Sequence, residues 1–189
     1  MMRDLSLHLL DIIQNSLAAH ATHISIQICA DKARDLLLLE VTDNGKGMSE
    51  SLCAQAADPF VTTRKTRTVG LGLPLLAAAA GRSAGNMSIE SIAGRGTRVK
   101  ASFRLSHLDR PPLGNIADSI VPVVASCPSL ELDILFANQA AVRQLQLSEI
   151  REQLGGIPLN NIEVLNWLGS YLQQCQKEIF GGVLDEVYC

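Results

Sequence analysis

This 189-residue sequence has few aromatic residues and no large excess of positive or negative charge. Aromatic residues make up 4% of the chain and hydrophobic residues 47%, so the core must be built from Leu, Ile, Val and Ala. The net charge of −3 gives no general attraction to nucleic acid or to a membrane surface. We therefore expect neither nucleic acid nor a membrane as a partner.

Paired cysteines and long apolar runs are missing as well. The five cysteines form no CxxC pair and no metal-ligand spacing, which indicates reduced thiols and a cytoplasmic protein. No apolar run reaches the ~18 residues that a membrane span needs. Asp4, His8 and Asp11 interrupt the apolar N-terminal stretch, so it is not predicted to be a signal peptide.

Hydrophobic periodicity predicts alternating helices and strands over the first 105 residues. Leu9, Ile12 and Ile13 belong to an apolar set at helical spacing, which predicts a helix over 3–20. The other expected elements are strands over 23–29 and 36–42, a short helix over 49–57, a helix over 71–81, and strands over 87–92 and 97–105. This order predicts the α/β (α+β) class, as a two-layer α/β sandwich with a mixed sheet.

The composition changes at residues 107–114, which we predict to be a linker because of Pro111, Pro112 and Gly114. The sequence thus predicts a domain at 1–106 and a small C-terminal α/β region at 115–189. Its expected elements are strands over 130–137 and 142–147 and helices over 148–155 and 162–180. The apolar side chains of the last helix either pack on its own strands or bind a partner, and the sequence leaves a homodimer open.

Three glycine turns and one polar helix face carry the candidate chemistry. The turns are Asp43-Asn44-Gly45-Lys46-Gly47, Gly70-Leu71-Gly72-Leu73 and Gly94-Arg95-Gly96-Thr97. His8, Asp11 and Asn15 are spaced so that they share one face of the first helix. Glycine lets the backbone turn sharply and approach a ligand closely. Together, in this order, these features indicate a nucleotide site.

These motifs, over residues 5–105, resemble the GHKL (Bergerat-fold) ATP-binding domain. Histidine kinases, gyrase, gyrase-like heat-shock chaperones, mismatch-repair ATPases, anti-sigma serine kinases and mitochondrial dehydrogenase kinases share this fold. The resemblance implies ATP and Mg²⁺ as cofactors. It implies that Asn15 gives its amide oxygen to Mg²⁺, that Asp43 accepts a hydrogen bond from the adenine amine, and that Thr97 lies near the adenine. The other ATP-binding residues that it implies are Gly45, Gly47, Met48, Arg64, Lys65, Gly70, Leu71, Gly72 and Leu73.

Position 11 separates the reactions of this family. Histidine kinases often carry Asn there because an imidazole acceptor needs no strong base, whereas the ATPases and serine kinases carry Glu. Asp11 keeps the carboxylate, and no dimerisation helix precedes the first helix, so the resemblance favours slow ATP hydrolysis or Ser/Thr phosphorylation over histidine autophosphorylation. We expect a regulatory enzyme of signal transduction that acts on a partner protein. The alternative is a non-catalytic nucleotide-sensing adaptor.

Overall fold

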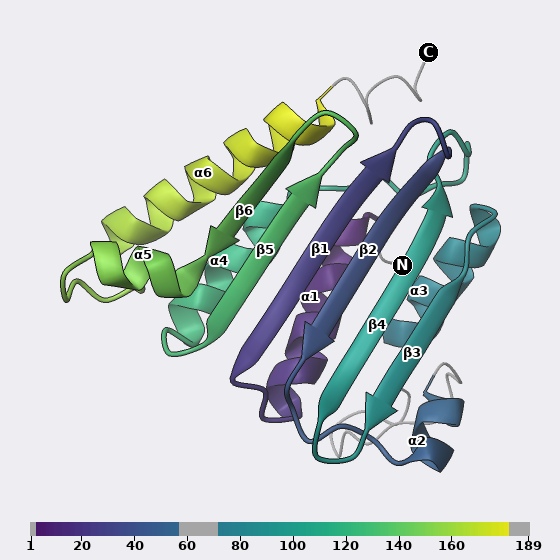
Figure 1. Cartoon of the computed structure of the whole chain (residues 1–189), viewed down its shortest axis with the longest axis horizontal. Helices are drawn as coiled ribbons and strands as arrows, with labels where there is room; N and C mark the ends of the chain where they lie inside the picture. Colours follow the sequence, from purple (N-terminus) through teal and green to yellow (C-terminus); the bar gives the residue numbers. More distant parts are fainter. Residues whose placement is uncertain (1–2, 57–71, 182–189) are drawn as a thin grey trace.

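The computed structural model describes residues 3–56 and 72–181. Its strands form one six-stranded sheet in the order β3-β4-β2-β1-β5-β6 (Figure 1). The strands are β1 (His23–Asp31), β2 (Leu36–Asp43), β3 (Met87–Ile92), β4 (Gly96–Arg104), β5 (Glu131–Ala137) and β6 (Val142–Gln146). The helices are α1 (Leu5–Ala18), α2 (Glu50–Gln55), α3 (Gly72–Arg82), α4 (Ile116–Ser126), α5 (Leu147–Gln153) and α6 (Ile162–Phe180).

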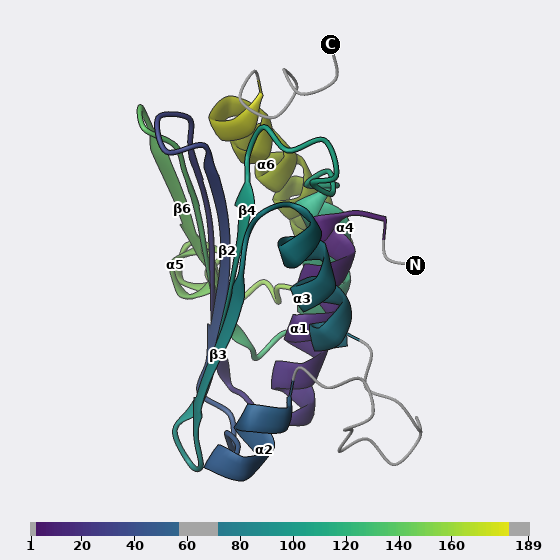
Figure 2. The same cartoon turned by 90° about the vertical axis from the view of Figure 1, so that its right-hand side faces the viewer.

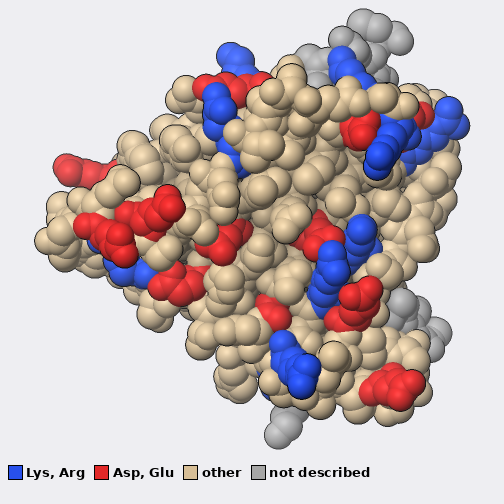
Figure 3. Space-filling view, viewed as in Figure 1, with Lys and Arg blue, Asp and Glu red and all other residues tan. Residues whose placement is uncertain are grey.

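Four helices, α1, α3, α4 and α6, lie on one face of the sheet (Figure 2). The pairing of β1 with β5 is parallel, whereas the other neighbours are antiparallel, so the sheet is mixed. These features confirm the predicted two-layer α/β sandwich. The opposite face of the sheet forms much of the surface in Figure 3. On β2, the buried carboxylate of Glu40 accepts a hydrogen bond of 2.9 Å from Arg98 Nε.

Helix α1 forms where the apolar periodicity predicted a helix, but it is shorter at both ends. The carboxylate of Asp4 accepts a hydrogen bond from the backbone N–H of Leu7 at 3.0 Å, which caps the helix and fixes its start. Leu9 and Ile13, on the apolar stripe, are fully buried against the sheet layer.

The C-terminal region continues the sheet of the first 106 residues. Strand β5 pairs with β1 from His23 opposite Glu131 to Cys29 opposite Ala137, so both regions share one sheet and one apolar core. The segment 107–114 is held against the start of α1, because Leu5 and Ser6 donate backbone hydrogen bonds of 2.9 Å to the carbonyls of Pro112 and Leu113. The division into domains at 1–106 and 115–189 stays a prediction.

Helix α4 was not predicted. It contains Pro122, a residue that normally argues against a helix interior because it has no N–H to donate. The apolar side chains of α4, among them Ile116, Ile120 and Val124, are fully buried, and this burial outweighs the lost hydrogen bond. Within the described residues, no helix combines the length and the hydropathy that a membrane crossing requires.

An acid-sensitive contact joins the β1–β2 turn to the end of β4. The carboxylate of Asp35 accepts hydrogen bonds from Arg104 Nε at 2.7 Å and from the backbone N–H and hydroxyl of Ser106 at 2.8 and 2.7 Å. Arg104 first, and then Ser106, lower the pKa of Asp35 to about 2. A carboxylate whose folded-state pKa is lowered stabilises the fold above its ordinary pKa, and this contribution disappears as the pH falls toward the lowered value.

We therefore expect Asp35→Asn to flatten the fall in melting temperature between pH 4 and pH 2. The amide keeps the left-handed backbone conformation at φ 52° that residue 35 adopts. The side chain is about a third exposed, so the effect on the free energy of unfolding at neutral pH should be about 1 kcal/mol or less. Thermal unfolding of both proteins across this pH range measures it, and identical pH profiles would contradict the assignment.

Candidate functional site

Three polar side chains, Asp43, Thr97 and Ser91, form a row on three neighbouring strands of the helix-covered face of the sheet, at the end of β2. Thr97 on β4 is the register partner of both Asp43 on β2 and Ser91 on β3. Register partners point to the same side of a sheet. The next row on this face, two residues further along each strand, consists of Ile89, Val99, Val41 and Ile26. The change from apolar to polar side chains between these two rows shows that the hydrophobic core ends at the polar row.

The carboxylate of Asp43 is held in place from two sides. Its Oδ2 accepts a hydrogen bond from the hydroxyl of Ser16 on α1 at 2.7 Å, and its Oδ1 accepts one from the backbone N–H of Gly45 at 2.8 Å. Ser16 is buried and Asp43 is half-buried. The carboxylate is thus fixed between the end of α1 and the first glycine turn, with lone pairs left over to accept further hydrogen bonds.

The first and third glycine turns pack so closely that the backbone of one contacts the backbone of the other. A Cβ at Gly47 would lie 2.1 Å from the carbonyl oxygen of Ile92, and a Cβ at Gly96 would lie 1.9 Å from that of Asp43. Both glycines have a positive φ, of 61° and 103°. The N–H of Gly94 also donates to the carbonyl of Lys46 at 2.7 Å. Side chains at 47 and 96 would therefore push the two turns apart.

Ser91 connects the two turns through its hydroxyl. The backbone N–H of Met48 donates to Ser91 Oγ at 2.8 Å, and Ser91 Oγ donates to the carbonyl of Gly96 at 3.0 Å. The hydroxyl of Thr97 lies 2.9 Å from the same atom. Neither Ser16 nor Ser91 was singled out from the sequence. Ser16 directly follows Asn15 on α1, whereas Ser91 gains its position only from the register of β3 with β4.

Asp11 and Asn15 lie together on α1, as predicted from their spacing. Asn15 Nδ2 donates to Asp11 Oδ2 at 3.1 Å. The start of α3 approaches the same carboxylate, because a Cβ at Gly72 would lie 1.7 Å from Asp11 Oδ2. Asp11, Asn15 and the start of α3 with Gly72 and Leu73 therefore form one cluster, in which a glycine at 72 is needed for the approach.

His8 lies one turn before Asp11 but is buried, with 3% of its surface exposed. Its Nδ1 has no hydrogen-bond partner among the described residues. Burial lowers the pKa of His8, while the negative charges of Asp11 and Asp4 raise it and Arg82 lowers it. Burial therefore favours the neutral form of the imidazole over the charged form.

Four of the predicted ATP-binding residues, Arg64, Lys65, Gly70 and Leu71, lie outside the described residues. Their predicted contacts with phosphate groups stay predictions. Gly45, Gly47, Met48 and Thr97 all lie within the two interlocked turns described above, together with Asp43.

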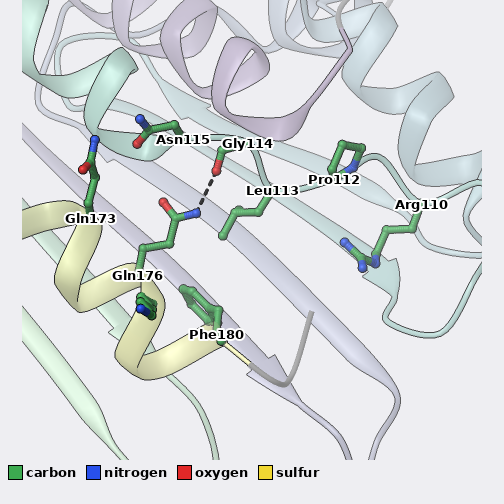
Figure 4. Close-up of a pocket in the computed structure, with 10 residues that line it drawn as sticks. Arg110, Pro112, Leu113, Gly114, Asn115, Gln173, Gln176 and Phe180 are labelled. Carbon is green, nitrogen blue, oxygen red and sulfur yellow. Dashed lines mark hydrogen bonds between the residues drawn. The ribbon is translucent and has the colours of Figure 1, made fainter. Parts of the chain in front are cut away.

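A pocket of about 440 Å³ lies at the opposite end of α1, between the 110–115 segment and the end of α6 (Figure 4). The side chain of Gln176 bridges its two walls, since it donates to the carbonyl of Gly114 at 2.7 Å and accepts from the N–H of Ile116 at 3.1 Å. Buried Arg110 lines the pocket and donates from Nε to the carbonyl of Leu105 at 2.8 Å. The pocket is separate from the polar row and contains none of the predicted site residues.

A comparison with known families identifies the family of this chain. The family described as "Histidine kinase-, DNA gyrase B-, and HSP90-like ATPase" matches residues 3–107, which contain the polar row, Asp11, Asn15 and all three glycine turns. The match covers more than half of the chain, so the chain belongs to this family. The resemblance inferred from the motifs is thereby confirmed.

The chain is also similar to individual proteins. It is 36% identical over 83 residues to the tetrathionate sensor histidine kinase TtrS of Salmonella typhimurium, a match that covers 44% of this chain and 14% of that protein. It is 32% identical over 88 residues to sporulation kinase C of Bacillus subtilis, covering 47% of this chain and 20% of that protein. The chain thus spans a fifth or less of the length of these relatives. The chain is also similar to a solved structure, the Aquifex aeolicus MutL ATPase domain complexed with ADP. The identity is 16%, the TM-score is 0.42, and the match covers 82% of this chain and 68% of that one.

Proposed function

We propose that this chain binds Mg·ATP beside the polar row and uses it to act on a partner protein, as a Ser/Thr-type protein kinase or a slow ATPase. The observation that carries the proposal is the position of Asp43, a half-buried carboxylate fixed by Ser16 and Gly45 in a row of hydrogen-bonding side chains. The carboxylate keeps lone pairs that can accept a further hydrogen bond from a ligand. The amine of adenine is a donor for such a hydrogen bond.

The side chains of Asn15 and Asp11 suit a magnesium ion, because they place an amide and a carboxylate side by side. Asn15 Nδ2 donates a hydrogen bond to Asp11, and an amide ligates a cation through its oxygen. Mg²⁺ prefers oxygen ligands and takes few from the protein, keeping waters and phosphate oxygens in its other positions. When bound, the ion would neutralise phosphate charge during transfer. We assign Asn15 as its protein ligand.

Asp11 is the proposed general base. A water molecule or a Ser/Thr hydroxyl must lose a proton to attack phosphorus, and a carboxylate can accept that proton. Asp11 lies between the proposed ligand Asn15 and the start of α3, where Gly72 meets it. Backbone N–H groups at a helix start favour phosphate, which supports placing the phosphates beside Gly72 and Leu73. Arg64, Lys65, Gly70 and Leu71 are proposed as further phosphate contacts.

Single-turnover incubation with γ-labelled ATP tests the catalytic part of the proposal. We expect release of labelled phosphate or labelling of a partner, slowed at least tenfold in Asp11→Asn because the amide cannot accept the proton. Binding of Mg·ATP, measured by calorimetry, should stay within about threefold of the parent protein, since Asn is close in size to Asp. Glu50→Gln, at an exposed carboxylate of α2, is the matched control.

The outcomes separate the two functional hypotheses. An unchanged rate in Asp11→Asn would remove Asp11 from its proposed role. Tight ATP binding with no turnover in the parent protein would favour the adaptor that binds nucleotide and a partner without chemistry. Absence of binding would reject both.

A further inference from the structure

We propose that Ser91 is a positioning residue that makes the site select adenine over 6-oxopurines, by fixing the direction of the Thr97 hydroxyl. The proposal rests on the proposed function, because it requires a purine nucleotide beside Asp43 and Thr97. It concerns a residue that lies one strand away from the predicted ATP-binding residues of β2 and β4.

The direction of the Ser91 hydroxyl follows from its three contacts. A serine hydroxyl has one proton to donate and two lone pairs that accept. Ser91 Oγ already accepts from the N–H of Met48 at 2.8 Å. The carbonyl of Gly96, 3.0 Å away, can only accept, so the one proton of Ser91 points to it. A proton placed anywhere else would leave two oxygen lone pairs facing each other at that distance.

The direction of the Thr97 hydroxyl follows in turn. Thr97 Oγ1 lies 2.9 Å from Ser91 Oγ, whose proton is already used and whose second lone pair is still available. Thr97 must therefore donate its own proton to Ser91. This is the arrangement of protons that satisfies all three contacts of Ser91 at once. It leaves Thr97 with lone pairs, and no proton, to offer a ligand.

Asp43, the register partner of Thr97, also offers only acceptors. Its two oxygens accept from Ser16 and Gly45, and an ionised carboxylate has no proton to donate. Directly opposite side chains on paired strands lie about 5 Å apart at Cβ. The 6-amino group of adenine carries two N–H donors, which match two acceptors placed this way. A 6-oxopurine would bring a carbonyl oxygen against the same acceptors, which is repulsive.

The experiment compares ATP with inosine triphosphate (ITP), which carries a 6-oxo group in place of the 6-amino group. Calorimetric titration of the full chain with each Mg·nucleotide gives two dissociation constants and their ratio. We expect the parent protein to prefer ATP at least tenfold. In Ser91→Ala the Thr97 hydroxyl loses its acceptor and can turn to donate to the 6-oxo group, so the preference should fall about fivefold, the value of one neutral hydrogen bond.

Two further variants sharpen the comparison. Ser91→Thr keeps the hydroxyl and should retain the preference for ATP. Ser88→Ala removes a hydroxyl from the same strand at an exposed position on the other face of the sheet and should change neither constant. Circular dichroism shows whether each variant is folded. If Ser91→Ala does not fold, Thr97→Val decides, since it removes the acceptor itself and should also lower the preference.

The possible failures are distinguishable. If Ser91→Ala weakens ATP and ITP equally, Ser91 only supports the turns and the inference is overturned while the proposed function stands. An unchanged ratio in Thr97→Val overturns it in the same way. If the parent protein binds neither nucleotide, the proposed function and the inference fall together.

Discussion

Replacing Asp43 with alanine is expected to lower the affinity for Mg·ATP by about a hundredfold, since a hydrogen bond to a charged group is lost. At an ATP concentration of ~100 Kd, the parent protein should be stabilised by about 2.7 kcal/mol. At that same concentration the variant should gain only about 0.4 kcal/mol, because its affinity is a hundredfold weaker. Thermal unfolding with and without Mg·ATP measures this difference.

The comparison should use the stabilisation caused by Mg·ATP in each protein, because Asp43→Ala also lowers the stability of the protein without ligand. The variant loses the hydrogen bonds from Ser16 and Gly45 to a charged carboxylate, which should cost about 1.5 kcal/mol or more each. Thr42→Ala is the matched control, since Thr42 is the preceding residue of β2 and is exposed on the opposite face. If ATP stabilises Asp43→Ala as much as Thr42→Ala, Asp43 does not contact the nucleotide.

Replacing Gly96 with alanine is expected to destabilise the protein by about 4 kcal/mol. Part of this cost is the strain of a Cβ at φ 103°, about 1 kcal/mol or more. The rest is the contact of that Cβ with the carbonyl oxygen of Asp43, 1.9 Å away, which forces the backbone of two strands apart. Urea unfolding followed by circular dichroism measures the loss.

Gly94→Ala is a control that separates the cost of backbone strain at a positive φ from the cost of the steric contact. It also has a positive φ, of 79°, but a Cβ there would meet nothing within 4 Å. Gly94→Ala should therefore cost only about 1 kcal/mol. Equal losses at the two positions would mean that the turns are not held at the close distance described, and the geometry of the polar row would need revision.

The elements near the site were predictable because their signals are local. The apolar period of α1 and the cap at Asp4 define a helix within one stretch of chain, and that helix carries Asp11 and Asn15. The turn after Asp43 follows from its glycines. Residues 57–71 contain other predicted phosphate contacts, and these stay predictions.

Features that depend on distant pairing were not predictable in the same way. Ser91 is an ordinary strand serine until β3 pairs with β4 and sets it beside Thr97. The parallel pairing of β1 with β5 joins residues that are about a hundred positions apart, and no pattern within either strand reveals its neighbour. Helix α4 was not predicted, and the Pro122 in its interior is a residue that local preference does not favour in a helix.

Because β1 pairs with β5, a fragment that contains only the family-matched residues 3–107 would have an exposed strand edge. Such a fragment would lose β5, and the backbone N–H and C=O groups along that side of β1 would have no strand to bond. A bare strand edge next to Ile24, Ile26 and Ile28 is a template for aggregation. The family-matched part, residues 3–107, is therefore best studied with the C-terminal strands attached.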